Sequence, residues 1–267
     1  MVKVWAIART SWQETIRRQV FYIVLLVTLL VGLIIGSQMV LVRMAGAAGE
    51  AAAVAQIRAS FIGTALQVWN AAVIFLAIFL GAITLSSEVS KKTIVHVLSR
   101  PVSRSAYLAG RWLGVLMFLW AFLALGVALS LLLAHYFNVG WTPMASVAVL
   151  GMFIKAAFFS GIAVAMSTFM VPMLAGCVSF VLYVLLPSYA VQGLHNPAWT
   201  PRILANALYY LLPARMPVDL LGESFSQQMI RPEYALYLEI LTENSLYVLA
   251  AFAVGCWILG RRELRLR

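Results

Sequence analysis

The hydrophobic positions of this chain fall into six long runs, which are separated by short stretches with polar or charged residues. Runs such as 25–35 and 71–83 are apolar on all sides, with neither the alternation of a membrane strand nor the one-sided stripe of a surface helix. About 20 residues of helix cross ~30 Å of hydrocarbon, so these lengths predict helices buried in lipid. The expected spans are residues 20–42, 63–86, 106–134, 145–169, 173–193 and 243–260.

Composition agrees with membrane helices. Of the 267 residues, 63% are hydrophobic and 10% are charged, which lies outside the range of soluble domains. We therefore predict an all-α integral membrane protein with six transmembrane helices in a single transmembrane domain, residues 1–267. Segment 43–62, rich in Ala and Gly, is expected to separate the first two spans. Cys177 and Cys256 lie inside apolar runs without metal-ligand spacing, so no metal site is expected.

Lys and Arg are distributed unevenly around these spans. Segments 1–19, 87–105 and 261–267 carry four each, whereas the stretches on the opposite side carry five in all. The positive-inside rule places these three segments, and hence both termini, in the cytosol. The longest non-spanning segment, 195–240, is then extracytoplasmic. Because the basic residues flank the spans, the net charge of +10 indicates contact with membrane lipids and not with nucleic acid.

Residues 1–19 show the pattern of an amphipathic helix. Apolar side chains recur every three or four residues, at Val4, Trp5, Ala8, Trp12 and Ile16, with basic residues between them. Such a helix lies in the cytosolic headgroup layer, where Trp5, Trp12, Arg17 and Arg18 would anchor it. The alternative is a loose basic flank to the first span.

The segment 87–105 is the most distinctive hydrophilic part of the chain. It begins with Glu88, closes with Pro101 and mixes basic with apolar residues. The basic ones are Lys91, Lys92, Arg100 and Arg104, and the apolar ones include Val89, Ile94, Val97 and Leu98. Two interpretations are open: a cytosolic helix whose apolar side chains fill a groove on a soluble partner, or a solvated turn that satisfies the positive-inside rule.

The stretch from the second to the third span resembles the permease subunits of type-2 ABC exporters. In that family an acidic residue ends the second span, a turn with Thr follows, and apolar residues lead to Pro-x-x-Arg and a Gly-Arg that opens the third span. The matching residues here are Glu88, Thr93, Val97, Leu98, Pro101, Arg104, Gly110 and Arg111. The likeness is nearest to the branch with permeases for multicopper-enzyme maturation, antibiotic efflux and gliding motility. Lys92 departs from the Gly that many members have before the Thr.

The resemblance implies a permease that couples ATP hydrolysis to export by alternating access. A separate cytosolic ATP-binding subunit would hold ATP and Mg and dock on a coupling helix between spans 2 and 3, so this chain would itself be no enzyme and hold no cofactor. The ATPase-coupling residues would be Glu88, Lys91, Lys92, Thr93, Val97, Leu98, Arg100, Pro101 and Arg104. A second permease subunit, identical or different, would complete a dimer in the bacterial cytoplasmic (inner) membrane.

Two basic residues lie within expected spans. Lys155 falls about ten residues into the fourth span, roughly 15 Å deep. Isolating a Lys there costs ~2.5 kcal/mol or more, so Lys155 is a candidate for the translocation path, where it would contact an anionic group of the substrate. The alternative is a structural Lys that snorkels or meets a backbone carbonyl. Arg111, near the start of the third span, is expected to snorkel to the cytosolic interface as a further anchor.

The sequence offers little for enzymatic chemistry. None of the nine Asp and Glu residues is central in a span, the three His residues are far apart, and neither HExxH nor GxxxxGK[ST] occurs. We therefore expect no catalytic residues. Two alternatives to transport stay open: a membrane scaffold that uses a partner ATPase for mechanical or assembly work, and a membrane-embedded enzyme.

Overall fold

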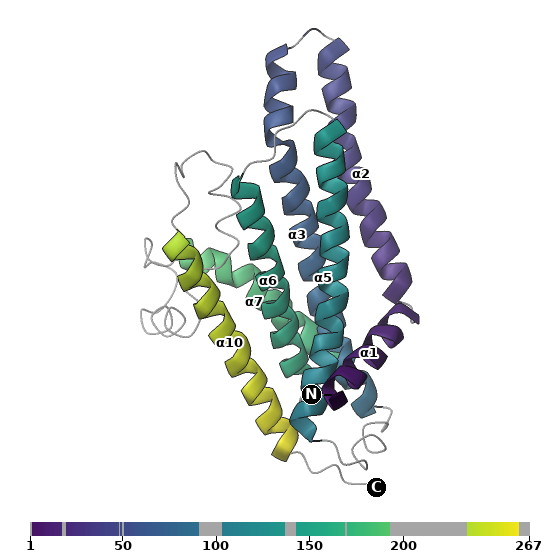
Figure 1. Cartoon of the computed structure of the whole chain (residues 1–267), viewed down its shortest axis with the longest axis vertical. Helices are drawn as coiled ribbons and strands as arrows, with labels where there is room; N and C mark the ends of the chain where they lie inside the picture. Colours follow the sequence, from purple (N-terminus) through teal and green to yellow (C-terminus); the bar gives the residue numbers. More distant parts are fainter. Residues whose placement is uncertain are drawn as a thin grey trace.

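Every regular element in the described part of the chain is a helix (Figure 1). The computed structural model describes residues 2–17, 20–47, 49, 51–90, 103–136, 143–168, 170–192 and 234–261. The helices are α1 (Val2–Arg17), α2 (Val20–Ala47), α3 (Ala51–Ser90), α5 (Arg104–Tyr136), α6 (Pro143–Ser167), α7 (Pro172–Gln192) and α10 (Tyr234–Arg261). The predicted all-α class is confirmed.

Several of these helices have the length and apolarity to cross a membrane. Within the described residues, three stretches are long and apolar enough to cross it: Phe61–Thr84 of α3, Ser105–Tyr136 of α5 and Ala148–Ser167 of α6. Shorter apolar stretches lie in the other three long helices, at Leu26–Ser37, Pro172–Tyr183 and Ser245–Ile258. The chain is therefore a multi-pass membrane protein, and each long helix overlaps one of the expected spans.

The segment expected to separate the first two spans, 43–62, is largely helical. α2 continues to Ala47 and α3 already begins at Ala51, with Gly49 at a φ of 77° between them. The stretch is rich in Ala and has no Pro, so its helix propensity is high although its apolarity is modest. α3 has 40 residues and is thus roughly 60 Å long. Similarly, α10 starts at Tyr234, inside the segment 195–240 that was expected not to span; residues 195–233 of that segment include none that the structure describes.

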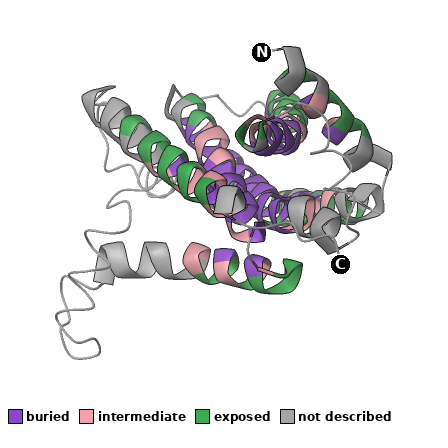
Figure 2. Ribbon diagram, turned by 90° about the horizontal axis from the view of Figure 1, so that it is seen from below, coloured by how far each residue is buried: buried purple, intermediate pink, exposed green. Residues whose placement is uncertain are grey.

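α3 forms the centre of the bundle. It packs against α2, α5, α6 and α7, while α6 also contacts α10. Figure 2 shows the buried residues concentrated in the middle of the bundle. They make one apolar cluster, to which α3, α5 and α6 contribute most side chains.

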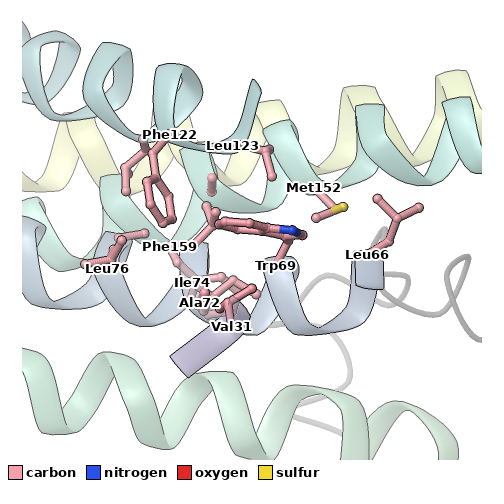
Figure 3. Packing of buried hydrophobic residues seen from close by; sticks show 14 of the residues in the cluster. Val31, Leu66, Trp69, Ala72, Ile74, Leu76, Phe122, Leu123, Met152 and Phe159 are labelled. Atoms are coloured by element: carbon pink, nitrogen blue, oxygen red, sulfur yellow. The ribbon is translucent and has the colours of Figure 1, made fainter. Parts of the chain in front are cut away.

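Trp69 is the largest side chain in this cluster. Only 1% of its surface is exposed, and its ring lies edge-on to Phe122 with centroids 5.5 Å apart. Figure 3 shows the ring among Phe122, Leu123, Met152 and Phe159. The ring also lies flat against α5 at Gly126, where an added Cβ would come within 2.5 Å of it. A glycine is thus needed at this point for α3 and α5 to approach.

α3 and α6 approach each other as closely at Gly81. A Cβ at this position would lie 2.6 Å from the Cβ of Ala163 and 3.1 Å from the backbone oxygen of Ser160. Small residues that let helix backbones meet are the usual device for helix packing in membranes, where lipid tails are as apolar as the side chains.

α1 is a helix over Val2–Arg17, and it runs obliquely beside the lower end of α5 (Figure 1). Its buried face is made by Ala8 and Ser11, which lie against Gly114 of α5. Trp12 adds an edge-on ring contact to Phe118, at 5.9 Å between centroids. The predicted helix is confirmed, and its position in the headgroup layer stays a prediction.

Candidate functional site

The two helices that flank the predicted coupling segment end at the same side of the bundle. α3 continues past its long apolar run through Ser86, Ser87 and Glu88 and ends at Ser90. α5 packs on α3 and begins at Arg104. Glu88 therefore belongs to the last turn of α3 and Arg104 is the first residue of α5.

The start of α5 is fixed by a serine cap. The backbone N–H of Ala106 donates to the Ser103 hydroxyl oxygen at 3.3 Å, and that of Tyr107 donates to the Ser103 carbonyl at 3.0 Å. A serine at this position satisfies amide groups that the first helical turn leaves free. The helix thus begins directly after the predicted coupling segment.

Most of the predicted coupling residues lie outside the described residues. This holds for Lys91, Lys92, Thr93, Val97, Leu98, Arg100 and Pro101. Of Glu88 and Arg104 the structure describes the helical backbone. It therefore places the two ends of the coupling segment, and the docking role of the segment itself stays a prediction.

The predicted anchors differ in their surroundings. Trp5 is 61% exposed and Trp12 is half-buried on α1. Arg17 is the last residue of α1, and Arg18 lies outside the described residues. Arg111 is only 7% exposed, and its guanidinium carbon lies 5.9 Å from the centroid of the Tyr107 ring. The guanidinium is therefore enclosed by protein, and its role as an interfacial anchor stays a prediction.

Lys155 lies in the middle of α6 and points into the bundle. Its side chain is 1% exposed, in keeping with the rule that the few charged residues within membrane spans face the interior of the protein. The ammonium nitrogen lies over the Tyr183 ring of α7, 5.0 Å from the centroid. A cation over an aromatic face is stabilised by the ring quadrupole, and this stabilisation is largest where water is excluded.

Tyr183 connects this lysine to two further rings. Its ring lies edge-on to Phe159 of α6 at 5.4 Å and tilted against Phe180 of α7 at 6.2 Å. The ammonium of Lys155 thus lies between α6 and α7 behind an aromatic layer. In this conformation Lys155 would reach a translocation path or a partner subunit only if that layer moved.

A family model of ABC-2 family transporter proteins matches residues 5–264, which is nearly the whole chain. The chain belongs to the ABC-2 transporter family. No curated protein is significantly similar to it. An ABC-2 membrane protein is the permease part of an ABC transporter, and such permeases work with a cytosolic ATP-binding partner. The match covers α2 to α10 and most of α1.

Among the residues that the structure describes, no three His, Cys, Asp or Glu side chains come together. Cys177 and Cys256 lie on different helices, α7 and α10, and both are free thiols.

Two polar residues of the bundle escaped the sequence reasoning. Asn70 of α3 and Tyr183 of α7 both lie within apolar stretches. Asn70 is buried, and its amide alone in a long apolar run was a signal that could have marked it. Tyr183 gave no such signal, because tyrosines are common in membrane helices and its contact with Lys155 depends on how α6 and α7 pack.

Proposed function

We propose that this ABC-2 chain is the permease subunit of an exporter that crosses the bacterial cytoplasmic membrane six times, with both termini in the cytosol. The observation that carries the proposal is the family match over residues 5–264; six long helices that overlap the expected spans support it, three of them apolar over a length that crosses a membrane. The excess of Lys and Arg at 1–19, 87–105 and 261–267 supports the orientation. The permease works as a dimer with two ATPase subunits and moves its substrate by alternating access.

Residues 88–104 are the docking element for the ATPase in this proposal. α3 carries the chain beyond the apolar stretch on the cytosolic side, and α5 returns it into the membrane from a capped start. A push on the element between them would move both helices, and α3 in turn packs against α2, α6 and α7. ATP and Mg belong to the partner, and this chain supplies no catalytic residue.

In this proposal Arg111 of α5 also stabilises the docking element, through the end of α3. It lies on α5 seven residues beyond Arg104, in the part of the helix against which α1 packs. We propose that Glu88 on the last turn of α3 pairs with Arg111 or with a basic residue of α1. Such a pair would hold the end of α3 to α5 or to α1 while the ATPase pushes on the coupling element.

The experiment is co-purification of the full-length chain with the ATPase encoded beside it. Wild type is compared with the double variant Glu88→Ala/Arg104→Ala, and the control is His135→Ala, which removes an exposed polar side chain at the opposite end of α5. We expect wild type and His135→Ala to retain the complex and its stimulated ATPase activity. The double variant should lose most of both.

Two results would count against this proposal. If no ATPase co-purifies with wild type, the chain does not act as a permease for that partner. If the double variant keeps full activity, the partner docks elsewhere. A charge exchange, Glu88→Arg with Arg111→Glu, then tests the pair on its own: each single change should weaken the complex and the exchange should restore it.

We propose that Lys155 lies beside the translocation path. In the conformation described here, Tyr183 separates its ammonium group from that path. The support is a cation at mid-membrane with an aromatic cover that belongs to another helix. Lys155→Met keeps most of the length of the side chain and removes the charge, so the fold should persist while ATP-driven transport in proteoliposomes falls. Equal transport by Lys155→Met would refute this role, and loss of folded protein would assign the lysine a structural one.

A further inference from the structure

Buried hydroxyl groups in the described helices are paired with backbone carbonyls of their own helix. They donate at 2.7 to 3.0 Å to a residue three or four positions earlier, and belong to Ser130, Ser160, Ser167, Thr168 and Ser179. Two indoles of α5 are paired as well. The Trp112 N–H donates to the Ser160 hydroxyl at 3.1 Å, and the Trp120 N–H donates to the Phe153 carbonyl at 3.2 Å.

Trp69 and Asn70 of α3 differ from these paired groups. Trp69 is 1% exposed and Asn70 is 6% exposed, yet among the described residues neither the indole nitrogen nor the side-chain oxygen has a hydrogen-bond partner. Both residues lie well inside the apolar stretch Phe61–Thr84, at a depth where the bilayer supplies no water. Burial of a polar atom without a partner is unfavourable, so an arrangement of α3 that pairs these atoms would recover free energy.

An acceptor for the Trp69 N–H lies one helical turn further along α5. The ring lies against Gly126, and Ser130 follows four residues later on nearly the same face. The Ser130 hydroxyl is buried and donates to the Gly126 carbonyl, which leaves lone pairs of its oxygen for another donor. Figure 3 shows the Trp69 nitrogen on the side of the ring toward Leu66 and away from Leu76. Because α5 runs opposite to α3, this is the direction in which Ser130 lies.

The buried side chains of α5 obstruct the Trp69 ring least in that same direction. Away from the coupling segment, the buried positions at four-residue spacing are Gly126, Ser130 and Ala134, all of them small. Toward the coupling segment the ring meets Phe122 edge-on. The shape of α5 therefore favours movement of α3 away from the coupling segment, by less than one turn of about 5.4 Å, over movement the other way.

α1 supports α5 against such a movement. α5 is the main neighbour of α1, and a Cβ added at Gly114 of α5 would lie 2.6 Å from the Cβ of Ser11. A push on the end of α3 would thus move α3 relative to α5. The direction of that push, from the coupling segment into the membrane, carries the Trp69 N–H toward Ser130.

We propose that α3 has a second position in the transport cycle, shifted along α5 by less than one turn, in which the Trp69 N–H donates to the Ser130 hydroxyl oxygen. In the position described here, the unpaired atoms of Trp69 and Asn70 reduce the free-energy difference that the ATPase must supply to reach the second one. The inference rests on the proposed function, because the ATPase provides the push.

The first measurement uses the full-length permease alone in nanodiscs, with isotope-labelled tryptophan indoles observed by NMR. The Trp69 signal is the one that Trp69→Phe removes. Because a hydrogen bond moves an N–H proton downfield, we expect Trp69 to resonate upfield of the paired Trp112 and Trp120. Ser130→Ala should leave the Trp69 signal unchanged in this state. A Trp69 signal as far downfield as the other two would overturn the inference.

The second measurement uses the complex with the ATPase, free of nucleotide and then trapped with ATP and vanadate. Trapping should move the Trp69 signal downfield, and Ser130→Ala should abolish that shift and lower the ATPase turnover severalfold. Ser167→Ala is the matched control, because this buried hydroxyl of α6 also donates to a carbonyl of its own helix. It should leave both the shift and the turnover unchanged.

Asn70→Leu tests the second unpaired atom by replacing the amide with an apolar side chain of similar size. The permease alone should then unfold severalfold more slowly in SDS, whereas faster unfolding would mean that the amide has a partner. If this variant fails to fold, the Trp69 signal of wild type still decides.

Two results in the complex would also overturn the inference. They are a Trp69 signal that does not move on trapping, and a shift that persists in Ser130→Ala. Both would leave the docking of the ATPase intact. If no ATPase associates, the proposed function fails, and the measurements on the permease alone still decide whether Trp69 and Asn70 are unpaired.

Discussion

α2 and α3 are both long, apolar helices, and they are neighbours, yet their side chains have opposite surroundings. Most described apolar residues of α2 are exposed, Leu33 by 62%, and its buried face is reduced to positions such as Val31 and Ile35. On α3 the described residues from Phe61 to Ala82 are mostly buried, with Leu66 and Leu76 fully so. Apolarity alone therefore does not decide which helix forms the core.

The difference between α2 and α3 lies in how closely each helix fits against its neighbours at small residues. α3 meets its neighbours through Gly81 against Ala163 and through Trp69 against Gly126, at distances that exclude even one additional methyl group. The glycines of α2, Gly32 and Gly36, have nothing within 4 Å of an added Cβ. In lipid no hydrophobic gain accompanies helix association, so close packing of this kind must stabilise the bundle.

The largest effect should come from the centre of α3. Trp69→Ala removes a side chain that α5 and α6 enclose, and the cavity left behind should lower the free energy of unfolding by about 3 kcal/mol. The measurement is unfolding in mixed micelles at increasing SDS. Trp257→Ala on α10 is the control, because that tryptophan is largely exposed; an equal loss there would mean that burial by protein contributes little.

Gly81→Val is the next test, and it acts by excess volume. Because the added Cβ would meet Ala163 and the backbone of Ser160, α3 and α6 must separate, at a cost of about 2 kcal/mol. Gly32→Val makes the same change on α2 with no neighbour to displace and should be nearly neutral. Equal stability of the two variants in the SDS titration would contradict the close approach of α3 and α6.

Sequence reasoning could anticipate the helices but not these contacts. The six runs and the lone Lys155 follow from composition and period, since a charged residue within an apolar run is visible in the sequence. The segment 43–62 between the first two spans is largely helical, because helix length follows propensity whereas the expected spans followed apolarity. The contact of Tyr183 with Lys155 was invisible, because it arises from the way α7 packs beside α6.

A smaller effect is expected at the edge of this core, where Tyr183 covers Lys155. Tyr183→Leu removes the ring but keeps an apolar side chain, so the bundle should lose about 1 kcal/mol of stability. Tyr183→Phe keeps the ring and should stay within a few tenths of wild type. In a Lys155→Met background the difference between the two variants should disappear. A difference that persists there would show that the ring acts through packing on Phe159 and Phe180 alone.

The smallest effect should come from α2 itself. Leu29→Ala truncates an exposed leucine, and lipid or detergent fills the space that the side chain leaves, so stability should change by less than about 0.5 kcal/mol. The same holds for Leu33→Ala. The SDS titration is run on dilute protein and again on protein reconstituted at high density. The variants could match wild type in the dilute sample but unfold at lower SDS in the sample reconstituted at high density. That result would mean that α2 contacts a second subunit through this face. The face would then be exposed in the single chain but covered in the dimer.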